Sequence, residues 1–125
     1  MPEFPSIVKE MNYRLRADGS QITVLAKVGS AQRGQPVAIL NENDVIPENP
    51  LPDGSVQFNV GRDSDLAGHV LRVQTFVSDV NPQTNLTVVN YTISGGLMTV
   101  TDKTQEFVEQ DGGRIGHFYF INFQS

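Results

Sequence analysis

Acidic and amide side chains that gather between apolar segments are the residues best suited to chemistry in this sequence. The stretch from Asn41 to Gly54 alone carries four of the fourteen acids. Carboxylate and amide oxygens are the ligands that Ca²⁺ prefers, and the same groups can hydrogen-bond to a sugar. If successive strands reverse direction, alternate loops lie at one end of the molecule and would bring these acids together. The candidate metal ligands are Asp18, Glu42, Asp44, Asp53, Asp79 and Asp111.

A second interpretation of the same residues is purely structural. Asp and Asn are common turn formers because their side chains hydrogen-bond to the nearby backbone. No stretch of the sequence matches the regular spacing of an EF-hand calcium loop. We therefore expect no cofactor, and Ca²⁺ is the one candidate. The default interpretation is that these loops are solvated turns. The alternative is a module that binds a carbohydrate or calcium at the acidic end.

Groups that could perform acid–base, metal or nucleophilic catalysis are few. The chain has two histidines, His69 and His117, and no cysteine, so the usual zinc ligand sets and a thiol nucleophile are missing. Both histidines are expected in strands, with no carboxylate at a suitable local spacing. The Gly95-Gly96 and Gly112-Gly113 pairs indicate turns and not phosphate-binding loops. The sequence predicts a protein that is not an enzyme.

The last apolar segment, from Ile115 to Phe123, lacks the polar face of an ordinary strand. A strand with one solvated face alternates apolar and polar residues, whereas this one is apolar on both faces. Its second face is predicted to lie under the long loop or the N-terminal segment, against another protein, or in a ligand groove. The candidate binding residues are His117, Phe118, Tyr119, Phe120 and Phe123.

The elements that position these residues show the two-residue period of β-strands throughout. The segment from Gln21 to Val28 is the clearest case, because Ile22, Val24 and Ala26 alternate with polar residues except for Leu25. Turn-forming residues separate the segments. Strands are expected at 7–16, 21–28, 36–40, 56–60, 71–77, 88–93, 97–109 and 115–123.

About eight short strands separated by turns are typical of a sandwich or a small barrel. The fold class is therefore predicted as all-β, an antiparallel two-sheet β-sandwich that forms a single domain over residues 1–125. A small closed β-barrel is the alternative fold. The proline-rich loop and the absence of tryptophan both argue against a barrel with a ligand cavity.

Strand order and length over the stretch from Gln21 to Ser94 resemble an immunoglobulin-like or fibronectin-like sandwich. The cysteine pair and central tryptophan of immunoglobulin cores are absent from this sequence. The resemblance is to an architecture and implies no functional residues.

Charge narrows the classes of partner. Nine basic and fourteen acidic residues give a net charge of −5, and no basic cluster is present. We therefore expect neither nucleic-acid binding nor membrane insertion. The N-terminus has no basic and apolar regions of a signal peptide, so none is expected, although a processed secreted chain would look the same.

These observations favour a non-enzymatic module that acts by surface contacts with a protein partner or by self-association. The alternatives are the carbohydrate- or calcium-binding module and a small ligand-binding barrel or enzyme, whose cavity would have to reach His117 or Tyr119.

Overall fold

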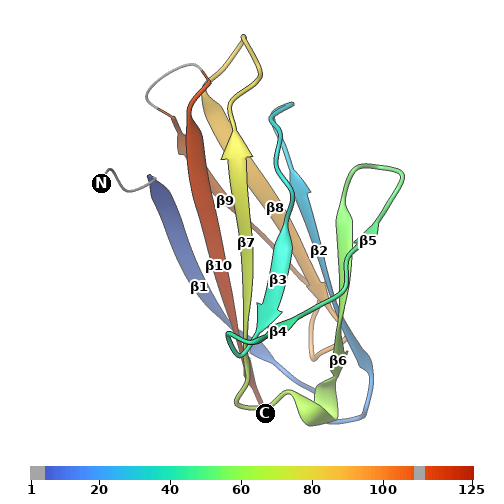
Figure 1. The fold of residues 1–125 in the computed structure, drawn as a ribbon. Coiled ribbons are helices and arrows are strands. Elements are labelled where there is room, and N and C mark those ends of the chain that lie inside the picture. The colour runs from blue at the N-terminus through green and yellow to red at the C-terminus, as the bar shows by residue number, and fades with distance from the viewer. Residues whose placement is uncertain (1–4, 109–111) are drawn as a thin grey trace.

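The computed structural model describes residues 5–108 and 112–125, and these residues form two five-stranded sheets packed face to face (Figure 1). The first sheet has the order β1-β10-β7-β3-β4 and the second β5-β6-β2-β8-β9. The two sheets do not close into a barrel, so the prediction of an all-β sandwich is confirmed. In chain order the elements are β1 (Ser6–Arg14), β2 (Gln21–Val28), β3 (Val37–Leu40), β4 (Asp44–Val45), β5 (Asn49–Pro50), β6 (Val56–Arg62), the 3₁₀ turn η1 (Asp63–Asp65), β7 (Val70–Ser78), β8 (Leu86–Ser94), β9 (Val100–Phe107) and β10 (Arg114–Gln124).

The core lies between the sheets and follows from the two-residue period of the sequence. Successive side chains of a strand point to opposite faces, so every second apolar residue is buried. In β2, Ile22, Val24 and Ala26 are fully buried, as are Leu71 and Val73 in β7. Burial of apolar surface is the main favourable contribution to this packing.

The pairing of β1 corrects the expectation of antiparallel sheets. This strand runs parallel to β10, in a register that extends from Ser6 opposite Gly116 to Arg14 opposite Gln124. All other strand pairs in the described part of the chain are antiparallel. The turn after β1 carries the chain into the second sheet, so β1 does not form a hairpin with β2 and pairs instead with the last strand.

The predicted long loop from Asn41 to Gly54 contains two very short strands. β4 pairs with β3 in the first sheet, and β5 pairs with β6 in the second, so the chain changes sheet between them. Pro50 is tolerated because β5 lies at the edge of its sheet. The chain therefore makes one additional pass along the sandwich, which the predicted strands did not include. As a result, each later loop lies at the opposite end from the predicted one (Figure 1).

No helix among the described residues is long and apolar enough to cross a membrane.

Candidate functional site

Strand β10 distributes the five candidate binding residues between two faces. His117, Tyr119 and Phe123 point into the core, where at most 2% of each is exposed. Phe118 and Phe120 point outward and are half-buried. The five residues therefore do not form one site, and only the two outward rings are available to a partner.

The outward rings belong to a larger surface on the first sheet. The register aligns Phe118 with Val8 of β1 and Gln74 of β7, and it aligns Phe120 with Glu10 and Arg72. These rows of outward side chains continue across the sheet, from β7 to β3 and then to β4. We call this surface the apolar outer face, and its members are Val8, Glu10, Val37, Ile39, Val45, Arg72, Gln74, Phe76, Phe118 and Phe120.

A glycine allows the aromatic rings of the apolar outer face to lie close to the sheet. Phe76 and Phe118 meet edge to face, with ring centroids 5.8 Å apart. A Cβ atom on Gly116 would lie 2.8 Å from the Phe118 ring and 3.3 Å from the Phe76 ring. The absence of a side chain at Gly116 therefore makes room for both rings.

Several members of the apolar outer face remain open to solvent. Val8 is 60% exposed, Val45 65% and Phe76 39%. These residues lie on three different strands, so the exposed apolar surface extends across the sheet. Contiguous surface of this kind is typical of interaction sites, whereas single exposed apolar residues need no explanation.

The outer face of the second sheet is polar by comparison. Most of the outward side chains of its strands are polar, with Leu25, Leu86 and Val88 as apolar exceptions. Phe107, at the end of β9, is an exposed aromatic residue on this face. The polar side chains on it include Thr23, Lys27, Gln57, Asn59, Asn90, Thr101, Lys103 and Gln105.

Two charged residues flank Phe120 on the apolar outer face. Glu10 on β1 is exposed, and Arg72 on β7 is half-buried. Among the residues that the structure describes, no acceptor hydrogen-bonds to the buried Nε atom of Arg72. Leaving a buried donor of a charged group unpaired costs free energy, and the rest of this half-buried side chain places a positive charge on the apolar outer face.

The inward face of β10 carries a buried polar network centred on His117. Its Nε2 atom lies 2.9 Å from the Thr87 hydroxyl, and its Nδ1 atom lies 2.8 Å from the Thr104 hydroxyl. Thr104 in turn lies 2.9 Å from the hydroxyl of Tyr91. Burial lowers the pKa of His117 to about 4, against the opposing effect of the negative charge of Glu106. Both ring nitrogens are occupied by buried partners.

Lys9 joins the edges of the two sheets. It interrupts the inward apolar face of β1, and its Nζ atom lies 2.7 Å from Oδ1 of Asp102 on β9. The Tyr119 hydroxyl donates a hydrogen bond of 2.8 Å to the other oxygen of Asp102. Burial acts to raise the pKa of Asp102, but hydrogen bonds from Lys9, the Lys103 backbone and Tyr119 lower it overall. The ion pair therefore lies where β1 and β9 meet.

The neighbourhood of Asp102 offers little enclosed space. Tyr119 stacks on Tyr91 with ring centroids 4.0 Å apart, which fills the core behind the ion pair. Burial raises the pKa of both phenols, that of Tyr91 to about 12. Outside, an open depression of about 340 Å³ is lined by Asn90, Thr101, Asp102 and Lys103.

The candidate metal ligands lie at both ends of the sandwich. Asp18 lies in the β1–β2 turn, and Glu42 and Asp44 lie at or just before β4, at the end of the sandwich where β10 finishes (Figure 1). Asp53 lies in the β5–β6 loop and Asp79 in the β7–β8 loop, at the other end (Figure 1). The additional pass through β4 and β5 explains this separation. Asp111 is outside the described residues. In the described part of the chain, no three His, Cys, Asp or Glu side chains gather closely enough to hold a metal ion.

Two of these acids stabilise their own turns. Oδ1 of Asp18 accepts the backbone N–H of Ser20 at 3.0 Å, and Oδ1 of Asp53 accepts that of Ser55 at 2.9 Å. Hydrogen bonds from the serine hydroxyls and backbones lower the pKa of both carboxyls. Their local geometry is that of turn-forming aspartates.

Asp63 is the structurally important acid that the sequence did not reveal. Its side chain accepts four backbone N–H groups of the β1–β2 turn, and only 1% of the residue is exposed. The donors are Arg16 at 2.9 Å, Ala17 at 2.8 Å, Asp18 at 3.4 Å and Gly19 at 2.7 Å. These partners are 44 to 47 residues away in the chain, so no local pattern indicates the contact.

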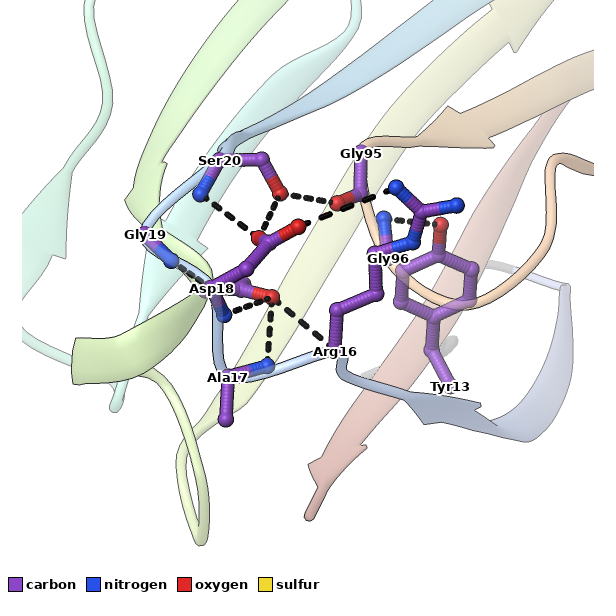
Figure 2. A network of polar contacts seen from close by, with 9 residues as sticks. Tyr13, Arg16, Ala17, Asp18, Gly19, Ser20, Gly95 and Gly96 are labelled. Carbon is purple, nitrogen blue, oxygen red and sulfur yellow. Dashed lines mark hydrogen bonds and ion pairs between the residues drawn. The ribbon is translucent and has the colours of Figure 1, made fainter.

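The turns after β1 and β8 meet beside this carboxylate. The Ser20 Oγ atom lies within hydrogen-bond distance of two acceptors (Figure 2), Oδ1 of Asp18 at 2.7 Å and the Gly95 carbonyl oxygen at 2.5 Å, which share its single proton. The Gly96 N–H donates to the Tyr13 hydroxyl at 2.9 Å. These hydrogen bonds connect the two sheets at one end of the sandwich.

Comparison with known proteins finds no matching family model and no significant similarity to a curated protein or a solved structure. The function of the protein has to be inferred from the residues of this chain.

Proposed function

We propose that this protein is a non-enzymatic β-sandwich module that acts by binding another protein surface through its apolar outer face. The observation that carries the proposal is the difference between the two sheets. The outer face of the second sheet is mostly polar, while that of the first presents Phe76, Phe118 and Phe120 together with exposed valines.

The composition of the apolar outer face suits a protein interface. Aromatic residues and arginine are enriched at the centres of such interfaces, whereas lysine and glutamate are depleted. Phe118 and Phe120 occupy successive outward positions of β10, and Arg72 lies beside Phe120 on β7. A surface of this kind left open to water would favour non-specific aggregation, so a specific partner also protects it.

The buried network supports the non-enzymatic part of the proposal. His117 is fully buried, and its two nitrogens are hydrogen-bonded to threonine hydroxyls. A general acid or base has to reach a proton of the substrate. The geometry instead suits a histidine that satisfies buried polar groups.

Site-specific cross-linking tests the proposal. A photoreactive amino acid replaces Val8 on the apolar outer face, and a matched control replaces Gln105 on the outer face of the second sheet. Both positions are exposed, and both lie on edge strands. The Val8 probe should give a discrete adduct with a protein, and Phe118→Ser in the same chain should reduce it. Equal adducts from both probes, or none from Val8, would contradict the proposal.

A further inference from the structure

The apolar outer face carries a charge pattern that is complementary to itself. Glu10, Phe120 and Arg72 form one row across β1, β10 and β7, with the aromatic ring between the two opposite charges. Rotation by 180° about an axis along β10 exchanges the positions of β1 and β7. In a second copy placed by this rotation, β1 with Glu10 would lie over β7 with Arg72 of the first copy.

We propose that the partner is a second copy of this chain, stacked face to face about a two-fold axis along β10; this inference rests on the proposed function. Phe118 and Phe120 then face the same residues of the second copy. Glu10 faces Arg72 of the partner subunit, and by symmetry the pair occurs twice. The contact places a carboxylate next to the half-buried side chain of Arg72 in each copy.

The charges distinguish this arrangement from other two-fold arrangements. An axis along β7 would place Arg72 opposite Arg72 of the partner subunit, and like charges facing each other are unfavourable. An axis across the strands at Phe120 would place each of the two charges opposite its own copy. The axis along β10 is the one of these that pairs Glu10 with Arg72. The like pair that it creates is Arg114 with its own copy, at the exposed start of β10 and away from the row of Phe120.

The size of the contact predicts a weak dimer. Three overlapping strands, about 4.8 Å apart and about 30 Å long, give a footprint of roughly 430 Å² per partner. A stable interface usually buries about 800 Å² per partner, so this contact belongs with transient ones. Self-association should therefore be reversible and dependent on concentration.

Sedimentation equilibrium of the purified protein from micromolar to millimolar concentration is the first measurement. A reversible monomer–dimer equilibrium is expected. Phe120→Ser should abolish the dimer, whereas Phe107→Ser, which removes an exposed aromatic ring from the other sheet, should leave it unchanged. A wild-type protein that stays monomeric throughout this range would overturn the inference.

Charge reversal tests the orientation. Glu10→Arg and Arg72→Glu should each raise the dissociation constant by roughly tenfold or more, because two attractive pairs become repulsive. An equimolar mixture of the two variants should restore association, since each Arg then meets a Glu of the other copy. Folded single variants that associate like the wild type, or that do not associate when mixed, would overturn the arrangement.

A cross-link keeps the test independent of the folding of the Arg72 variant. The chain has no cysteine, so a single new cysteine reacts alone. Stacked sheets lie about 10 Å apart, and a bis-maleimide with a spacer of about 8 Å can therefore join Asn122→Cys, on the outward face of β10, to its copy while both aromatic rings stay in place. Asn122→Cys should cross-link faster than the control Phe107→Cys, although Phe107 is 63% exposed. Equal rates would overturn the arrangement.

The two proposals fail in different ways. If the protein is monomeric but the Val8 probe still gives a specific adduct with a different protein, the second-copy inference is wrong and the proposed function stands. If the Val8 probe reacts with nothing, both are wrong.

Discussion

His117 shows how burial converts a titratable side chain into a structural one. Its imidazole lies between two threonine hydroxyls, and burial holds its pKa near 4. The ring is therefore neutral in the folded protein at physiological pH. It satisfies hydrogen bonds that an apolar residue would leave unmade.

This position makes folding stability depend on pH in a defined window. The pKa of His117 is about 4 in the folded protein and near 6.5 when unfolded. Between these values the unfolded chain binds a proton that the folded chain does not, so the free energy of unfolding falls as the pH falls. Urea unfolding from pH 7 to pH 4 should show this decline, and His117→Gln should flatten it. An equal slope in both proteins would contradict the assignment.

Asp63 should be among the polar residues most important for stability. Asp63→Asn replaces one carboxylate oxygen by a donor that faces backbone N–H groups. We expect a loss of about 2 to 4 kcal/mol in the free energy of unfolding, because buried charge-assisted hydrogen bonds are lost. The control Asp65→Asn, on an exposed side chain of the same 3₁₀ turn, should change it by less than about 0.5 kcal/mol. Similar losses in the two variants, measured by urea unfolding, would contradict this role.

The turns differ in how strictly they require glycine. Gly95 has a φ of +101°, and a Cβ atom there would lie 2.0 Å from the Gln21 carbonyl oxygen. Gly19 has a φ of +81°, but nothing lies within 4 Å of its Cβ position. The first glycine is needed for space and conformation, and the second for conformation alone.

Alanine substitutions should separate these two requirements. Gly19→Ala should cost about 1 to 2 kcal/mol from the left-handed backbone alone. Gly95→Ala should cost at least about 3 kcal/mol, since the backbone of β2 has to move as well. Thermal melts followed by circular dichroism compare the two. A Gly95 variant as stable as the Gly19 variant would show that the two turns pack more loosely than described.

Local periodicity explains which elements could be predicted. The alternation of Ile22, Val24 and Ala26 depends only on neighbouring residues, so the strand and its buried face follow from the sequence. The same alternation predicted that His117 and Phe118 lie on opposite faces. The parallel partner of β1 could not be predicted in this way, because Ser6 pairs with a residue about a hundred positions later.

The candidate metal site depended on a count of strands, and that count was incomplete. β4 and β5 have two residues each, too few to show any period. Because this pass of the chain was not predicted, Asp79 was expected at the same end of the sandwich as Asp18, whereas it lies at the other end. The predicted end of a loop changes when a single short strand is missed. The two faces of one strand do not depend on how many strands precede it.

The protein as a whole exposes one unusual surface, and its hydrophobicity can be measured directly. Phe118→Ser and Phe120→Ser should each reduce the fluorescence of an apolar dye that binds the wild type. Phe107→Ser should change the signal less, because that ring is not part of the apolar outer face. The Phe118 and Phe120 variants should stay folded, since their side chains lie outside the core. A larger decrease with Phe107→Ser would contradict this picture.

The parallel pairing of β1 with β10 also has a mechanical consequence. The chain enters β1 at one end of the sandwich and leaves β10 at the other (Figure 1). A pull on the two chain ends would therefore act along the strands and slide β1 past β10. All the hydrogen bonds of that ladder would be loaded in shear at the same time, whereas an antiparallel hairpin pulled from its open end separates one bond after another. The ladder would therefore resist such a pull more strongly than a hairpin that opens from one end.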